Sequence, residues 1–414
     1  MNALIRIRNT APVFVIALSL VTATASTTDV IFSFEEDEGE YADTDLETDS
    51  AGNIYGTTVL GGEFGGGTVF QLSPARTGWN HTVLYSFTGG ADGGEPYKGV
   101  TIDPGGYSAT DASAGNSLYG TAVTGGSGSC EGGCGVVYKL SKSNGTWNQT
   151  VIYAFTGGAD GSGPGARVTV DRSGDVYGMT PTGGTYGVGT IYKLHPDAGS
   201  YTFQVIHTFT GGNDGATGSA GRMLLQHGRL YGAATAGGMY GSGVVFELTP
   251  TGVGEWDFRT LYSFHGQPDG SFPYGALLRI GSGKIYGTTY YGGKNGIGSV
   301  YELSPRPVGE WDGRVIYSFQ PGNDGNSPIS NLVRDAAGNL YGTTSEGGLG
   351  SGTIFKLTPI GGGQWTESVV HPFEGPPDGG FSYNGMVVDR FGNFYGATVH
   401  GGTDDDGCVY KFTP

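Results

Sequence analysis

Apolar and polar positions alternate with a period of two along many short segments of the chain. Ser299–Leu303 is a clear example. Such alternation is typical of a half-buried β-strand. Gly, Asn, Asp and Pro separate these segments, and no stretch keeps a helical period. The pattern predicts an all-β fold made of short strands and tight turns.

The strand pattern recurs seven times, and the dipeptide Tyr-Gly marks each copy. These dipeptides begin at Tyr55, Tyr119, Tyr177, Tyr231, Tyr286, Tyr341 and Tyr395. Their spacings are 64, 58, 54, 55, 55 and 54 residues, and the two longest each include an insertion, at 104–114 and in the loop of Cys130 and Cys134. Each copy holds four segments, A to D, which in one copy are Pro273–Leu278, Ile285–Thr289, Ser299–Leu303 and Arg314–Phe319. Four short antiparallel strands repeated in this way predict a seven-bladed β-propeller.

The two ends of the repeat array suggest how the ring closes. Asp29–Phe34 matches the D segment Val83–Phe87, whereas the chain ends with Cys408–Phe412, a C segment. The last copy therefore lacks its own D strand, and the N-terminal strand can complete it. We expect this pairing to close the ring and to remove its open edges.

The first residues have the features of a secretory signal peptide rather than of a folded domain. Arg6 and Arg8 form a positive region, residues 11–21 are apolar but too short to span a bilayer, and Ala23–Ala25 offers a small-residue cleavage site. The alternative is a retained membrane anchor. We expect residues 1–25 to be removed.

The remaining residues, 26–414, are expected to form a single propeller outside the cytoplasm, either periplasmic, extracellular or on the cell surface. No later stretch is apolar enough for a membrane span. Loss of the two leader arginines takes the formal charge from −17 to −19. Such a protein should repel nucleic acid and anionic lipid. Its acidity either attracts cations or basic partners or simply keeps a glycine-rich surface soluble. We expect a monomer.

Composition agrees with a strand-rich fold, because 82 of the 414 residues are Gly and 12% are aromatic. Three cysteines are present. Cys130 and Cys134 lie in one loop and should form a disulfide in an oxidising compartment. Cys408 is left over, and we interpret it as a small buried strand residue whose oxidation state the sequence does not give.

The run Gly338–Thr344, followed by Gly347–Gly348 and Gly352–Leu357, resembles the GloVer tandem repeat of bacterial choice-of-anchor proteins. Phe87–Gly93 matches the other half of that repeat. The resemblance implies export from the cytoplasm and no established activity. Members often carry a C-terminal anchor, but the chain stops at Pro414. The order of Tyr-Gly, Gly-Gly, C segment and Trp is also loosely similar to kelch propellers.

In a propeller, the D-to-A and B-to-C loops lie on one face. That face should carry six Asp-Gly turns and the Gly-Gly loops. The turn aspartates are Asp92, Asp160, Asp214, Asp269, Asp324 and Asp378. We interpret them as structural caps of their own turns, with Ca²⁺ binding as the alternative. No cofactor is otherwise expected.

One loop offers a more concentrated set of acids. Asp404, Asp405 and Asp406 lie in the last B-to-C loop, near His400. They are the best local candidates for a metal ion, and solvated loop charge is the alternative.

Two further sets of residues could bind a ligand. Tryptophans begin most D segments and should pack between blades: Trp79, Trp147, Trp256, Trp311 and Trp365. Irregular aromatic and polar residues lie at the entrances of A segments, where they should ring the mouth of the central channel: Tyr97, Lys98, Arg167, Tyr274, Asn331, Tyr383 and Asn384. These positions differ between blades, as an asymmetric ligand requires, and variable loop edges without a role are the alternative.

Catalytic motifs are scarce. No HExxH, GxSxG or GK[ST] motif occurs, and no catalytic residue is assigned. The first hypothesis is therefore a secreted or cell-surface scaffold that binds carbohydrate or protein. The alternatives are a lyase, lactonase or glycoside hydrolase acting in the channel, and a structural surface-coat protein.

Overall fold

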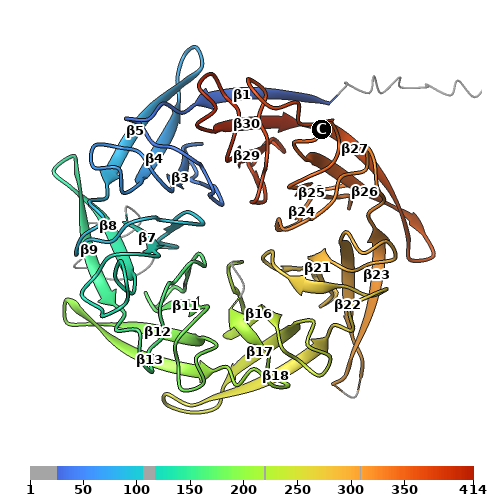
Figure 1. The fold of residues 1–414 in the computed structure, drawn as a ribbon, viewed down its shortest axis with the longest axis horizontal. Helices are drawn as coiled ribbons and strands as arrows, with labels where there is room; N and C mark the ends of the chain where they lie inside the picture. Colours follow the sequence, from blue (N-terminus) through green and yellow to red (C-terminus); the bar gives the residue numbers. More distant parts are fainter. Residues whose placement is uncertain (1–25, 106–116, 219–220, 308) are drawn as a thin grey trace, which may run out of the picture.

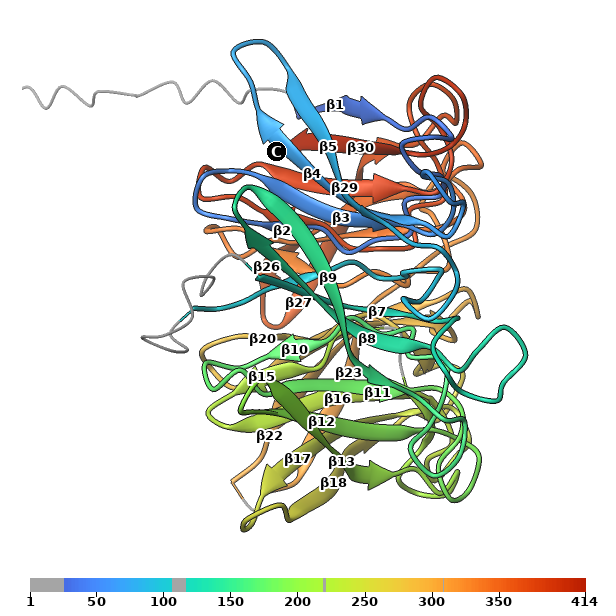
Figure 2. The ribbon, with the colours of Figure 1, turned by 90° about the vertical axis from the view of Figure 1, so that its left-hand side faces the viewer.

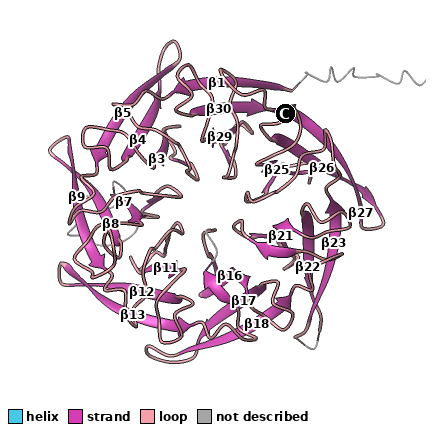
Figure 3. Cartoon of the chain, in the orientation of Figure 1, coloured by secondary structure: helices cyan, strands magenta, loops and turns pink. Residues whose placement is uncertain are grey.

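The computed structural model describes residues 26–105, 117–218, 221–307 and 309–414, and these form strands and loops with no helix. The predicted signal peptide and most of the predicted insertion at 104–114 lie outside the described residues. Seven antiparallel sheets stand around a central axis (Figures 1 and 3). Seen from the side, the strands cross the thickness of the disc and the loops gather on its two faces (Figure 2). The predicted seven-bladed propeller is confirmed.

Blades 1 to 3 follow the predicted order of four strands, from the axis outward. Blade 1 has β2 (Glu47–Thr48), β3 (Ile54–Thr58), β4 (Thr68–Pro74) and β5 (Trp79–Ser86). Blade 2 has β6 (Thr101–Ile102), β7 (Ser117–Ala122), β8 (Val136–Ser143) and β9 (Thr146–Ala154). Blade 3 has β10 (Thr169–Val170), β11 (Val176–Thr180), β12 (Thr190–Asp197) and β13 (Ser200–Thr208).

Blades 4 and 5 each split the inner strand into two short pieces. Blade 4 has β14 (Ala216–Gly218), β15 (Leu224–Gln226), β16 (Arg229–Ala236), β17 (Val244–Pro250) and β18 (Trp256–Ser263). Blade 5 has β19 (Ser271–Pro273), β20 (Leu278–Arg279), β21 (Ile285–Tyr291), β22 (Ser299–Pro305) and β23 (Trp311–Ser318).

Blade 6 returns to the order of four strands. It has β24 (Val333–Arg334), β25 (Leu340–Thr344), β26 (Thr353–Gly361) and β27 (Gln364–Pro372).

Blade 7 is built from both ends of the described chain. Its strands are β28 (Val387–Val388), β29 (Phe394–Thr398), β30 (Cys408–Thr413) and β1 (Thr27–Ser33). β1 runs antiparallel to β30, with Thr27 opposite Thr413 and Ser33 opposite Cys408 (Figure 1). The predicted closure by the N-terminal strand is thus confirmed, and it covers an edge that would otherwise be open.

The innermost strands are shorter than the sequence pattern predicts. In blade 5 only β19 and β20 pair with β21, and residues 274–277 between them leave the ladder. The inner segments approach one another closely at the axis. A Cβ on Gly275 would overlap the backbone of Ser330 in blade 6. Crowding therefore replaces regular pairing by irregular backbone around the channel.

Each Tyr-Gly pair has a packing reason. The glycine lies opposite an aromatic residue of the neighbouring strand, as in the pairs Gly178–Tyr192 and Gly232–Phe246. A Cβ on either glycine would overlap that ring. The glycine therefore gives the aromatic ring room to lie flat on the sheet, and the ring is fully buried.

Tryptophans at the start of the outer strands join neighbouring blades. The ring of Trp256 lies 5.9 Å from that of Tyr177 in the preceding blade, in edge-to-face contact. Trp79 of blade 1 makes the same contact with Tyr395 of blade 7, at 5.8 Å, across the closure. The tyrosine of Tyr-Gly is the partner in both cases. Aromatic pairs of this kind bury large areas, so each blade is stabilised by its neighbours.

The cysteines occupy two different environments. Cys130 and Cys134 form a disulfide in the loop between β7 and β8. Cys408 is buried and unpaired, and its Sγ lies 3.1 Å from the hydroxyl of Thr398. Blades 1, 3, 5 and 6 hold a pair of hydroxyls at the equivalent place. Burial raises the pKa of the Cys408 thiol to about 12, so it stays protonated.

No helix in the described part of the chain is long and apolar enough to cross a membrane.

Candidate functional site

The loops that carry the sequence-predicted residues lie together on one face. The D-to-A loop of each blade is hydrogen-bonded to the B-to-C loop of the next. In blade 3, for example, Gly184 N donates to Gly158 O at 2.9 Å. The two sets of loops therefore form a continuous surface around the channel mouth.

The six turn aspartates each accept hydrogen bonds from their own turn. Asp160 Oδ2 accepts from the backbone N–H of Thr156 at 2.8 Å and from the hydroxyl of Tyr153 at 3.0 Å. The other five accept the equivalent backbone N–H: Asp92, Asp214, Asp269, Asp324 and Asp378. In each blade the aspartate caps the turn and fixes the end of the outer strand.

The acidic loop of blade 7 does not converge on one point. His400 Nδ1 lies 3.7 Å from Asp405 Oδ2, and Asp405 Oδ1 accepts from the N–H of Gly401 at 2.8 Å. Partial burial and the nearby charge of Asp404 raise the pKa of Asp406. Within the described ranges, no three His, Cys, Asp or Glu side chains are grouped so that they could hold a metal ion.

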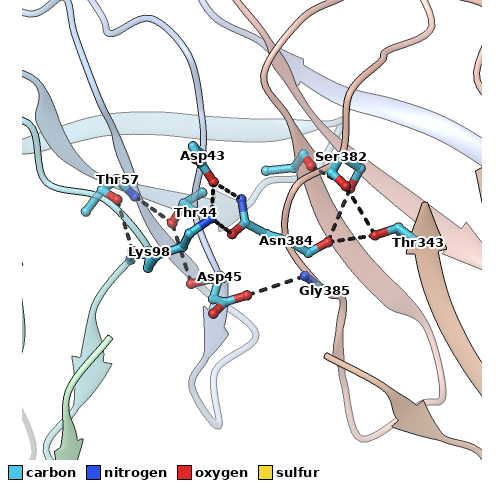
Figure 4. Close-up of polar contacts among 11 residues, drawn as sticks. Asp43, Thr44, Asp45, Thr57, Lys98, Thr343, Ser382, Asn384 and Gly385 are labelled. Atoms are coloured by element: carbon cyan, nitrogen blue, oxygen red, sulfur yellow. Dashed lines mark hydrogen bonds and ion pairs between the residues drawn. The ribbon is translucent and has the colours of Figure 1, made fainter. Parts of the chain in front are cut away.

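The channel mouth holds a buried polar cluster that joins three blades (Figure 4). Lys98 Nζ of blade 2 donates to Asp43 Oδ1 of blade 1 at 2.6 Å and to Asn384 Oδ1 of blade 7 at 3.0 Å. Asn384 Nδ2 in turn donates to Asp43 Oδ1 at 2.6 Å. Burial alone would lower the pKa of Lys98, but the Asp43 carboxylate outweighs it and raises that pKa. The ammonium is therefore charged and held by two partners.

A second charged layer lies one step further into the channel. Asp43, Asp45 and Glu47 occupy alternate positions of the inner segment of blade 1. Glu47 forms an ion pair with Arg167 of blade 3, and Arg222 of blade 4 lies 3.7 Å from the same carboxylate. Burial and the neighbouring arginine lower the pKa of Arg167 from its ordinary value.

Asp45 lies between these two layers. Its Oδ1 accepts from the backbone N–H of Gly385 at 3.4 Å (Figure 4). Burial raises the pKa of Asp45, although the charges of Arg167 and Lys98 act against this. This carboxyl therefore gains a proton more readily than an ordinary aspartate does.

Above the polar cluster, the mouth widens into a hollow of about 440 Å³, which we call the tyrosine hollow. Its lining residues are Asp43, Lys98, Phe272, Tyr274, Tyr290, Tyr291, Ile329 and Tyr383. Aromatic rings thus form one wall, and the Lys98–Asp43 pair forms part of the base. This mixture of apolar walls and a few fixed polar groups is common in small-ligand sites.

The structure brings most of the predicted ligand-binding residues together. Lys98, Tyr274 and Tyr383 line the tyrosine hollow, and Asn331 and Asn384 line the narrow space beneath it. The other two do not line the tyrosine hollow. Arg167 belongs to the deeper charged layer, and Tyr97 is partly buried next to Lys98 in the sequence.

Sequence reasoning missed two groups. The first is Asp43, Asp45 and Glu47, whose spacing of two residues on an inner segment was a usable signal for one channel-facing wall. The second is the pair Tyr290–Tyr291, which extends the Tyr-Gly strand of blade 5 where blade 6 has Ser345–Glu346. Both groups differ from the repeat pattern, and the differences are visible when the seven copies are aligned position by position.

The same face carries exposed apolar side chains at the tips of B-to-C loops. These are Phe64, Tyr186, Met239, Tyr240 and Leu349. Tyr186 is 61% exposed and lies outside the lining of the tyrosine hollow. These tips surround the mouth on several sides and add apolar surface beyond it.

Solved structures with a similar fold come from distant organisms. A protein from Lactobacillus plantarum shares 16% identity and covers 84% of this chain and 88% of its own, with a TM-score of 0.53. A hypothetical selenium-binding protein from Sulfolobus tokodaii shares 11% identity and covers 80% and 78%, with a TM-score of 0.52. Identities this low show a shared fold alone. Among curated proteins, no relative of the sequence is found.

A family model gives a more specific result. The model of the Gloeobacter/Verrucomicrobia repeat matches residues 105–351 and 256–414. These stretches together cover most of the chain and include the run from Gly338 to Leu357, which carries one half of the GloVer resemblance. The chain therefore belongs to the Gloeobacter/Verrucomicrobia repeat family.

Proposed function

We propose that this propeller binds carbohydrate in the tyrosine hollow. The observation that carries the proposal is the pairing of an aromatic wall with a fixed polar base. Tyr274 and Tyr383 line the hollow with aromatic rings, on which the C–H face of a sugar could stack, and Lys98 and Asp43 offer a donor and an acceptor for its hydroxyls. Both polar groups are already held in place by Asn384, so little ordering is needed on binding.

The charge of the base favours a neutral sugar. Lys98 and Asp43 neutralise each other at 2.6 Å, so the base presents hydrogen-bonding groups without a net charge. A concave space of about 440 Å³ also suits a small group better than a protein surface, which is usually broad and flat. A glycan is therefore favoured over a protein partner.

We further propose that the protein works outside the cytoplasm. Two features support this. Residues 1–25 have the charge and apolar pattern of a signal peptide. The disulfide between Cys130 and Cys134 also suits an oxidising compartment.

The test uses the mature chain, residues 26–414, on a glycan array, followed by calorimetry with each glycan that binds. Tyr274→Ala and Tyr383→Ala should each weaken binding about fivefold to tenfold, because an aromatic stacking contact contributes about 1 to 1.4 kcal/mol. The control is Tyr186→Ala, which removes an exposed ring from the same face outside the hollow and should leave the affinity unchanged. The proposal fails if no glycan binds, or if Tyr186→Ala weakens binding while the two hollow variants do not.

A catalytic role in the channel is the second candidate, and Asp45 is the observation that favours it. Its raised pKa would suit a general acid. The space beside it, however, is about 10 Å³, which accommodates about one water molecule. Binding therefore fits the geometry better. Release of reducing sugar or opening of a lactone, lost in Asp45→Asn and kept in Asp404→Asn, would reverse this order.

A further inference from the structure

The tyrosine hollow has a floor made of side chains from both sides of the ring closure. Lys98 of blade 2 and Asn384 of blade 7 are 7% and 2% exposed, and their side chains meet at 3.0 Å. Beneath the hollow, the remaining space is about 10 Å³, lined by Asp45, Asn331 and Asn384 among others. That volume holds about one water molecule and no sugar ring.

The channel is narrow here because the inner segments of the other blades touch one another. A Cβ on Gly221 would overlap the backbone of Ala276 in the next blade, and one on Gly385 would overlap the side chain of Asn331. Small residues therefore bring these segments into contact at the level of the floor. The inner segments cannot move apart unless whole blades move, because they are already close-packed.

Charged side chains cross the channel again below the floor. Arg222 of blade 4 lies 3.7 Å from Glu47 of blade 1. Next to this contact, the described residues enclose a space of about 370 Å³ lined by Arg172, Leu224 and Leu225. The tyrosine hollow and this space are thus separated by two layers of hydrogen-bonded and ion-paired side chains.

We propose that the tyrosine hollow is a blind pocket that recognises the end of a glycan chain and not its interior. This inference rests on the proposed carbohydrate-binding function. A terminal sugar has one free side, so it can enter head-on and place that side against Lys98 and Asp43. An internal sugar carries a chain on both sides, and a closed floor leaves no path for the second chain. The chemical class of ligand is therefore a neutral glycan with an accessible terminus.

The test compares chain ends with chain interiors at equal sugar concentration. The probes are linear hexasaccharides with the linkage of maltose, cellobiose, laminaribiose or xylobiose, and the linear polymers with the same linkages. A further probe is cyclomaltohexaose, which has no chain ends. Calorimetry with the mature chain measures affinity per mole of chains. For a linkage that binds, this affinity should stay constant from hexasaccharide to polymer, and if the maltose linkage binds, the cyclic form should not.

A second comparison identifies the terminus. Borohydride reduction of the reducing end and methylation of the non-reducing terminal sugar alter one end each. One of the two changes should weaken binding at least tenfold, and the other should have little effect. The inference is overturned if affinity per mole of chains rises in proportion to length, or if neither modification matters.

Failure of the inference differs from failure of the proposed function. Binding that depends on Tyr383 but includes chain interiors keeps the carbohydrate site and removes the blind pocket. Absence of any glycan binding, or binding that Tyr383→Ala leaves intact, removes both.

Discussion

At the scale of single residues, the glycine of each Tyr-Gly pair is explained by the ring that lies over it. In blades 1, 4 and 6 this ring is Phe70, Phe246 or Phe355, whereas in blades 2, 3 and 7 it is Tyr138, Tyr192 or Tyr410. The three tyrosines are fully buried, and in the described part of the chain the hydroxyls of Tyr138 and Tyr192 have no hydrogen-bond partner. A buried hydroxyl without a partner costs free energy.

Tyr192→Phe should therefore raise the free energy of unfolding by up to about 1 kcal/mol. Phenylalanine already occupies the equivalent place in blade 4, as Phe246, so the ring itself fits. Urea unfolding of the mature chain measures the effect. The control is Tyr153→Phe, which removes a hydroxyl that donates to Asp160 at 3.0 Å and should lower stability by a similar amount. A loss of stability in both variants would contradict this explanation.

Residue patterns predicted part of the candidate site. Lys98, Tyr274 and Tyr383 stood out because they break the repeat at the entrances of inner segments. The direction of each side chain was not predictable, since these segments leave regular pairing. Lys98 has a φ of 62°, a left-handed conformation that no sequence pattern indicated. The bond from Lys98 to Asn384 also joins residues 286 positions apart, which only the closed ring brings together.

At the scale of elements, the outer strands determine how blades meet. The second residue after each tryptophan contacts the outer strand of the preceding blade. In blade 4 this residue is Phe258, which stacks on His207 at 4.0 Å. In blade 6 it is Glu367, which lies next to Asp324 and Tyr317 of blade 5 in a groove of about 650 Å³. Two carboxyl groups thus meet where blade 4 places the ring of Phe258.

This contact makes stability depend on pH. Burial and the neighbouring Asp324 raise the pKa of Glu367 from 4.5 to about 8. Between these two values the folded protein keeps a proton that the unfolded chain has released. The free energy of unfolding should therefore fall as the pH rises through this window.

Glu367→Gln should remove that fall, because a neutral amide cannot lose the proton. Wild type and variant should unfold at similar temperatures near pH 4 and diverge toward pH 8, where the variant should be the more stable. The control is Glu374→Gln, an exposed side chain in the turn that Asp378 caps. A variant curve parallel to that of wild type from pH 4 to pH 8 would contradict the assignment.

The order of elements was predictable, and their lengths near the axis were not. Alternation and turn residues predicted the second, third and outer strands of every blade because these lie in regular sheets. The innermost strands were predicted to be longer than the two or three paired residues that form. Contacts such as that of Gly275 with Ser330 decide this, and they arise only when seven blades converge.

At the scale of the whole molecule, ring closure and the candidate site depend on the same seam. β1 completes blade 7, and Phe34 directly after it is fully buried against Phe70 of blade 1, with ring centres 5.0 Å apart. The Lys98–Asp43–Asn384 cluster joins blades 2, 1 and 7 across this seam. A ring that opened here would separate the polar base of the tyrosine hollow.

Phe34→Ala should lower the free energy of unfolding by about 3–5 kcal/mol, because it leaves a cavity at the seam. Val30→Ala, in β1 just before Phe34, is the matched control, since Val30 is 37% exposed and its loss should cost less than about 1 kcal/mol. Chemical denaturation of both variants measures the difference. Equal and small effects would mean that the N-terminal strand does not hold the ring together.

Amide hydrogen exchange of the mature chain tests the central claim most directly. If β1 closes the ring, those backbone amides of residues 27–33 that point toward β30 should be protected to the same degree as the amides of 408–413 with which they pair. Exchange of 27–33 at the rate of a free peptide, while 408–413 stay protected, would contradict closure and would also remove the physical basis of the site.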